Sequence, residues 1–221
     1  MKIINILLPV IGCFIGFIIA FNYKPKKLKL ILAFSGAFLI SLIVSDILPV
    51  IYIQPSFTPG PWIMTGILLQ IILEFFSKGA EHGHSHSRKN KNQSLLILGS
   101  LCFHAILEGF PVNKFETLSL GLFIHKIPVA MVVYFIFNKN GSSNFLNIFC
   151  LILFSIATPL GTIISYNFPV LESLLNHLTS IVVGMLLHIG TTILFESSEG
   201  HKFNIQKILS IIAAILIASI I

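Results

Sequence analysis

Apolar runs long enough to cross a membrane recur from one end of this 221-residue chain to the other. The hydrocarbon core of a bilayer takes about 20 apolar residues per helix. Only 10% of the residues are charged, whereas a soluble domain carries roughly 25%. These features exclude a soluble enzyme, a nucleic-acid-binding domain and a disordered protein. They predict an all-α polytopic membrane protein with eight transmembrane helices, expected at 3–22, 29–51, 61–78, 94–112, 116–137, 145–166, 177–197 and 205–221.

The basic residues predict the direction of these helices, because Lys and Arg favour cytoplasmic loops. Eleven of the fourteen basic residues fall in or beside the odd-numbered loops: Lys24, Lys26, Lys27, Lys29, Lys78, Arg88, Lys89, Lys91, Lys139, Lys202 and Lys207. We therefore place these loops in the cytoplasm and both termini outside. The first three helices then run opposite to the last three around a central pair, which is typical of a three-two-three inverted-repeat bundle in transporters.

The whole chain, 1–221, is predicted to be a single transmembrane domain. Its first apolar run resembles a signal peptide, but no A-x-A cleavage site follows it, so we expect a first transmembrane helix. Residues 78–93 form a polar cytoplasmic loop that contains His82, His84 and His86. Composition favours weak metal capture by this loop, and a solvated linker is the alternative. Three cysteines stand singly in apolar runs, so neither a disulfide nor a thiolate metal site is indicated.

Ionisable side chains inside the membrane are functional candidates, because each is costly there unless it is paired or faces water. The predicted spans contain Asp46, Glu74, His104, Glu108, His125, Lys126, His188 and Glu196. His104 and Glu108 are one turn apart and share a helix face, while His125 lies at a similar depth on the next helix. Two imidazoles and one carboxylate suit a borderline divalent cation such as zinc.

Two simpler interpretations stay open for these residues. The three central side chains can serve only to hydrogen-bond one helix to another, as polar residues in membrane bundles do. A lone histidine on an apolar helix, such as His188, is more often a packing residue than a ligand. In favour of the metal interpretation, Pro111 and Pro128 follow the candidate ligands, and a proline in a span frees a carbonyl one turn back.

Six motifs follow one another along the predicted helices. The second helix ends in SDILP, and the third contains LLQIILEFF before the histidine-containing loop. The fourth and fifth carry H-A-x-x-E-G and H-K-x-P-x-A, the sixth contains ATPLG, and the seventh contains VVGMLLHIGTTILFE. In this order and at this spacing, the series resembles the Zrt/Irt-like (ZIP) family of divalent metal transporters over almost the whole chain.

The resemblance implies an eight-helix bundle, arranged three-two-three, that moves a metal toward the cytoplasm. By position, the histidine and glutamate of the fourth helix and the histidine of the fifth match the central metal-binding positions. Asp46 matches an acidic position near the outer mouth. Glu74 and the three loop histidines match the cytoplasmic exit region.

The departures from the family pattern predict one central metal rather than two. Lys126 occupies a position that is acidic in members with two adjacent metals, and Val129 stands where many members have a carboxylate. Ala105 replaces a common asparagine. The form H-K-x-P-x-A resembles the subgroup with a single-metal site. His188 falls where relatives often have an aromatic residue. We also expect Lys126 to modulate the site, by pairing with Glu108 in the empty protein.

The function expected from these patterns is uptake of zinc across a bacterial cell membrane by alternating access, with Fe²⁺, Mn²⁺ and Cd²⁺ as other candidate substrates. The metal would pass from Asp46 through the central site toward Glu74 and Glu196. Zinc is then cargo, no cofactor is needed and the protein is not an enzyme. The alternatives are an intramembrane metalloenzyme, although the chain has no HExxH, and a non-transporting metal sensor. Gly12 and Gly16 form a GxxxG pattern compatible with a homodimer.

Overall fold

The computed structural model describes residues 2–23, 27–54, 57–80, 91–139, 144–168, 170–196 and 205–221, apart from the side chains at 91–92, 139, 144, 170–173 and 196. The predicted loop histidines His82, His84 and His86 and the side chain of Glu196 therefore lie outside the described residues. The elements in chain order are α1 (Ile3–Asn22), α2 (Leu28–Leu42), η1 (Ile43–Ile47), α3 (Leu48–Tyr52), α4 (Pro59–Ser77), α5 (Lys91–Gly109), η3 (Phe110–Asn113), α6 (Glu116–Lys139), α7 (Asn144–Asn167), α8 (Val170–Glu196) and α9 (Ile205–Ala218).

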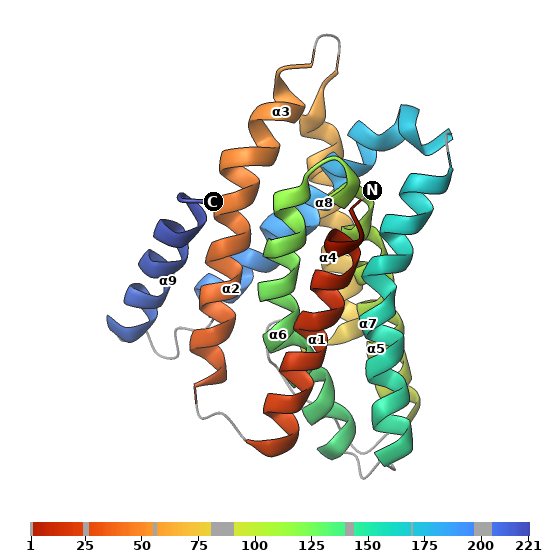
Figure 1. Cartoon of the computed structure of the whole chain (residues 1–221), viewed down its shortest axis with the longest axis vertical. Coiled ribbons are helices and arrows are strands. Elements are labelled where there is room, and N and C mark those ends of the chain that lie inside the picture. Colours follow the sequence, from red (N-terminus) through yellow and green to blue (C-terminus); the bar gives the residue numbers. More distant parts are fainter. Residues whose placement is uncertain are drawn as a thin grey trace.

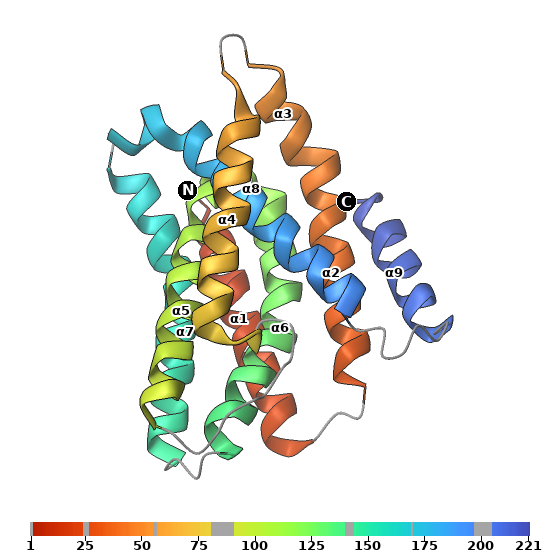
Figure 2. The same ribbon diagram turned by 180° about the vertical axis from the view of Figure 1, so that it is seen from behind.

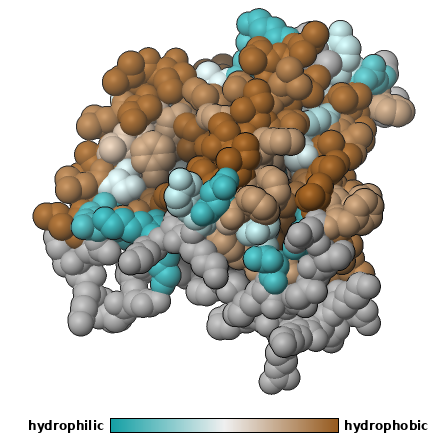
Figure 3. All heavy atoms as spheres, turned by 60° about the horizontal axis from the view of Figure 1, so that its bottom comes forward, coloured by the Kyte–Doolittle hydropathy of each residue, from teal (hydrophilic) through white to brown (hydrophobic). Residues whose placement is uncertain are grey.

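Seven of the helical segments in the described ranges are long and apolar enough to cross a membrane, which confirms seven of the eight predicted spans. One of them is continuous from α2 through η1 to α3. The eighth segment, α9, has 14 residues and so is about 21 Å long, shorter than a bilayer core of about 30 Å. Hydrophobic residues dominate the flanks in Figure 3, and hydrophilic ones gather toward the ends. The chain has the architecture of a multi-pass membrane protein.

The helices form a bundle in which particular pairs make the main contacts. The pairs are α1 with α6, α5 with α7, α4 with α8, and α2 with α9, while α2 also packs against α6 and α8. Figure 2 shows α8 crossing between α4 and α2, and α9 lying outside α2. In Figure 1 the end of α1 and the start of α7 lie at the lower end, whereas α3 and the start of α8 lie at the upper end.

Glycines set the closest helix approaches in the bundle. Gly161 of α7 faces the backbone of Ile106 in α5, and a Cβ at this position would clash with the Ile106 carbonyl oxygen. Gly12 and Gly16 of α1 face carbonyl groups of α6 in the same way. The GxxxG pattern in the sequence is therefore used for packing within this chain. Small residues at these contacts let backbones come close where no hydrophobic force draws helices together.

Polar contacts tie together the segments at the upper end. Lys2 lies 2.6 Å from the carboxylate of Glu116, at the start of α6. Gln54, which follows α3, donates from its amide nitrogen to the Asn176 side chain in α8 at 3.3 Å. Lys114, between η3 and α6, donates to the same Asn176 oxygen at 2.8 Å. The N-terminus and the regions beside the second, fourth and sixth connections therefore lie at one end, as the alternating topology requires.

Gly161→Ala is expected to lower the free energy of unfolding by about 1–3 kcal/mol, because an added methyl group overpacks the α5–α7 contact. Gly99 of α5 is the matched control, since a Cβ there would have nothing within 4 Å. Gly99→Ala should leave stability unchanged or raise it, because alanine favours a helix by about 1 kcal/mol over glycine. Thermal unfolding in detergent measures both. Equal melting temperatures for the two variants would contradict the close approach of α5 and α7.

Candidate functional site

A buried polar cluster lies where α4, α5, α6 and α7 meet. Its first two members come from α5, where His104 and Glu108 are 3% and 0% exposed. His104 Nε2 is 3.2 Å from Glu108 Oε2. The four-residue spacing thus brings an imidazole nitrogen and a carboxylate oxygen to one point, as the sequence predicts. Neither group faces water, so each depends on partners from neighbouring helices.

Lys126 of α6 is the charge partner of Glu108. Its ammonium group forms an ion pair with Glu108 Oε1, and both side chains are almost fully buried. The pairing confirms that the lysine of H-K-x-P-x-A reaches the carboxylate of H-A-x-x-E-G. A buried carboxylate without such a partner would be strongly destabilising. In this arrangement the ammonium group already neutralises the Glu108 carboxylate.

Helix α7 contributes two further contacts to the ion pair. The Thr158 hydroxyl donates to Glu108 Oε1 at 2.8 Å. The Lys126 Nζ lies 4.3 Å from the centroid of the Phe154 ring, in a cation–π contact. Phe154 and Thr158 are one turn apart, so a single face of α7 contacts both partners of the pair. Neither residue is predicted from the sequence pattern, although Thr158 belongs to the ATPLG motif.

Helix α4 contributes Gln70, which is fully buried. Its side-chain oxygen Oε1 is 3.0 Å from His104 Nδ1. This residue, too, is not among those predicted from the sequence. The available signal was that Gln70 precedes Glu74 by four residues and therefore lies on the same face of α4. Polar partners from three other helices thus surround the two α5 side chains.

His125 is buried, at 2% exposure, beside Lys126 in α6. It lies within electrostatic range of the Glu108 carboxylate. However, among the side chains that the structure describes, no three His, Cys, Asp or Glu residues form a group that could hold a metal ion. Two of the three predicted ligands are therefore together, and the complete set is not assembled. The position of Lys126 on Glu108 gives a physical reason, because the carboxylate already has a cation.

Two of the predicted pathway residues contact each other. His188 Nε2 of α8 lies 2.8 Å from Glu74 Oε2 of α4. The side chains are 20% and 25% exposed, so this pair is more accessible than the central one. Since Glu74 is one turn from Gln70, the same face of α4 serves both pairs. His188 is thus a paired side chain rather than an isolated packing residue.

Asp46 lies apart from these contacts in η1, the π-helical turn between α2 and α3, and is half-buried. Pro49 explains the irregular turn, because it cannot donate the backbone hydrogen bond that a regular helix needs there. π-Helical turns recur at functional sites.

Cys13, Cys102 and Cys150 are free thiols, in agreement with the expectation of no disulfide.

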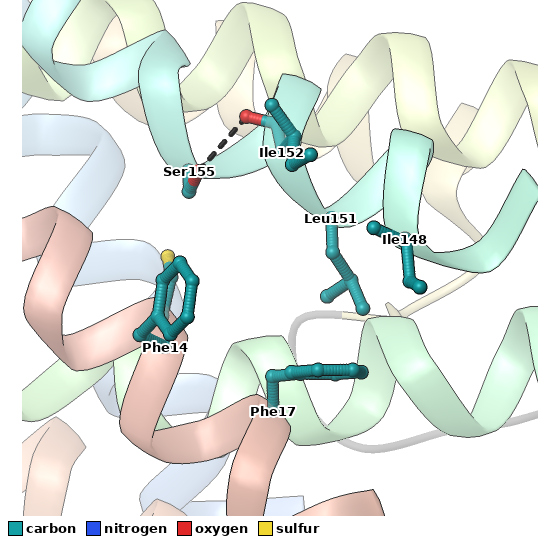
Figure 4. Close-up of a pocket in the computed structure, with 7 residues that line it drawn as sticks. Phe14, Phe17, Ile148, Leu151, Ile152 and Ser155 are labelled. Carbon is teal, nitrogen blue, oxygen red and sulfur yellow. Dashed lines mark hydrogen bonds between the residues drawn. The ribbon is translucent and has the colours of Figure 1, made fainter. Parts of the chain in front are cut away.

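An apolar pocket lies between α1 and α7 on the side of the bundle, as Figure 4 shows. It is lined by Cys13, Phe14, Phe17, Ile148, Leu151, Ile152 and Ser155. The Ser155 hydroxyl is already used, since it donates to the Ile152 carbonyl at 2.9 Å. Its exposed side chains, Phe14, Ile148 and Ile152, are apolar, which suits contact with lipid. The polar cluster is therefore the candidate site.

Replacing one partner of the buried ion pair is expected to destabilise the protein by about 3–5 kcal/mol. Lys126→Met leaves the Glu108 charge buried without its cation, so its melting temperature should fall. The double variant Glu108→Gln/Lys126→Met removes both charges and should recover most of the loss. Lys2→Met, which breaks only an exposed pair, is the control and should unfold like the unmodified protein. A double variant as unstable as Lys126→Met would contradict the pairing.

The cluster offers nitrogen and oxygen donors in a dry environment, which suits either a transition-metal ion or a hydrogen-bonded junction of helices. A buried ion pair with a neighbouring histidine is also the arrangement in which proton or cation exchange can be coupled to helix movement. Comparison with protein-family models, with curated proteins and with solved structures finds no match for this chain.

Proposed function

We propose that this protein transports a divalent metal ion, zinc before Fe²⁺, Mn²⁺ or Cd²⁺, across a cell membrane into the cytoplasm. The observation that carries the proposal is the buried His104–Glu108 pair, with oriented partners from α4, α6 and α7 in a bundle that is otherwise apolar. Intramembrane ionisable residues are rare and mark ion pathways. The motif resemblance to the Zrt/Irt-like family points to the same function.

The proposed metal site consists of His104, Glu108 and His125. For the metal to bind, the Lys126 ammonium group must leave Glu108, and the cation–π contact that it already makes with the Phe154 ring at 4.3 Å would still favour a nearby position. Binding is then an exchange of one cation for another at the same carboxylate. A lysine tethered beside the site would also repel a second dication, which supports a single central metal.

The helix pairs support a three-two-three inverted-repeat arrangement. The pair α1–α6 has a counterpart in α7–α5, and the pair α4–α8 has a counterpart in α9–α2. If α1 is exchanged with α7, α2 with α8, α4 with α9 and α5 with α6, each of these pairs is converted into its counterpart. Such repeats allow alternating access by rocking about a site near the midplane.

The proposed path begins near Asp46 and ends near the Glu74–His188 pair. The positive-inside bias places the end of α4 toward the cytoplasm. Near this end the partly exposed pair joins α4 to α8, with Glu74 Oε2 and His188 Nε2 2.8 Å apart. A carboxylate and an imidazole there can receive the metal from the central site through ligands of the same chemistry. The loop histidines His82, His84 and His86, with Glu196, would complete the exit.

Zinc uptake into proteoliposomes that contain a zinc-sensitive dye tests transport. The unmodified protein should give saturable influx, and His104→Ala should abolish it because a ligand is lost. His177→Ala is the matched control, since His177 contacts the rings of Phe57 and Trp62 away from the site. Equal influx in all three proteins would place the site elsewhere. Absence of influx in the unmodified protein would contradict transport and favour a sensor.

Lys126→Met is expected to raise zinc affinity by about tenfold or more, because it removes the cation that competes for Glu108. Titration against a fluorescent chelator in nanodiscs measures the Kd. The protein should have His82, His84 and His86 replaced by Ser so that loop binding does not contribute. Lys114→Met, which removes a charge at the outer end, should leave the Kd unchanged. An unchanged Kd for Lys126→Met would refute competition.

A further inference from the structure

We propose that Gln70 is a positioning residue that fixes the tautomer of His104, so that Nε2 is the nitrogen presented to the metal. The inference rests on the proposed function and deepens it. It assigns a role to α4, which carries none of the three central ligands. It also explains why an uncharged amide is fully buried at the centre of the bundle.

The hydrogen bond between Gln70 and His104 determines the tautomer. The atom of Gln70 that lies 3.0 Å from His104 Nδ1 is the side-chain oxygen Oε1. An amide oxygen only accepts hydrogen bonds, so Nδ1 must carry the proton and donate it. In a neutral imidazole the lone pair is then on Nε2. Metal-binding histidines commonly donate their other ring N–H to a carbonyl or carboxylate, which fixes the ring orientation.

The direction of Nε2 completes the geometry. This nitrogen is 3.2 Å from Glu108 Oε2, so the imidazole and the carboxylate point toward one another. In the metal-free protein the carboxylate can accept a hydrogen bond from Nε2, and a metal ion that binds both groups would replace that proton while Nδ1 keeps its own. Gln70 therefore favours the form of His104 that can bind a metal together with Glu108.

The position of Gln70 is set by the packing of α4. One turn earlier, Gly66 brings the α4 backbone against the Ile181 carbonyl of α8, where a Cβ would not fit. This close contact limits how α4 can rotate or shift. The tautomer of His104 is thus linked to the position of α4, whose next turn carries Glu74.

A purely structural role makes a different prediction, and Ser100 provides the matched control. The Ser100 hydroxyl of α5 donates to the Leu73 carbonyl of α4 at 2.7 Å. It is a buried polar contact between the same two helices, one turn from His104, and it does not touch the imidazole. If Gln70 only joins α4 to α5, then Gln70→Leu and Ser100→Ala should have the same consequences.

The test compares Gln70→Leu, Gln70→Glu and Ser100→Ala in nanodiscs, with the three loop histidines replaced by Ser. Zinc affinity is measured by chelator competition, and stability by thermal unfolding without metal. Gln70→Leu should weaken zinc binding by about 10- to 100-fold. Gln70→Glu keeps an acceptor for the Nδ1 proton and should restore binding. Ser100→Ala should bind zinc like the unmodified protein.

Nitrogen-15 NMR measures the chemical shifts of the histidine ring nitrogens, which report protonation and metal binding and would not change if Gln70 contributed only to packing. The His104 signals are assigned by their loss in His104→Ala. In the unmodified zinc-loaded protein, Nδ1 should be protonated and Nε2 should bind the metal, and Gln70→Leu should give a mixture of the two zinc-bound nitrogens. Unchanged ring signals and unchanged zinc affinity in Gln70→Leu would overturn the inference alone. Failure of the unmodified protein to bind zinc would instead overturn the proposed function.

Discussion

The ion pair between Glu108 and Lys126 is the interaction on which the centre of this bundle depends. Both groups are buried among apolar helices, where an isolated charge would be several kcal/mol less stable than in water. Thr158 and Phe154 of α7 contact the pair, and His104 extends it toward Gln70 of α4. The polar network therefore fixes how four helices meet, in a bundle whose other contacts are largely non-directional.

The same pair limits what the site can do with a cation. Lys126 already neutralises Glu108. The binding free energy of an incoming dication would therefore include only the difference between its own interaction with the carboxylate and that of the ammonium group. Transport requires binding that is firm enough to remove water from the ion and weak enough to release it. In the proposed transport cycle, Lys126 would meet this requirement as a tethered competitor, because it would return to the carboxylate when the metal leaves.

The sequence predicted those features that depend on local spacing. Apolar length gave seven of the spans, and the four-residue spacing placed His104 and Glu108 on one face. It did not reveal Gln70 or Thr158, because a polar partner on another helix depends on which faces meet. That register is set by close contacts such as the one at Gly161. The short length of α9 was also missed, since its apolar run continues beyond the last helical turn.

X-ray absorption spectroscopy of the zinc-loaded protein tests the central claim most directly. The protein should have His82, His84 and His86 replaced by Ser and should carry no affinity tag. We predict a first shell of nitrogen and oxygen at about 2.0–2.1 Å, with an imidazole contribution that decreases in His104→Ala. A sulfur shell at about 2.3 Å, or a spectrum unaffected by His104→Ala, would contradict a metal site at the Glu108–Lys126 pair.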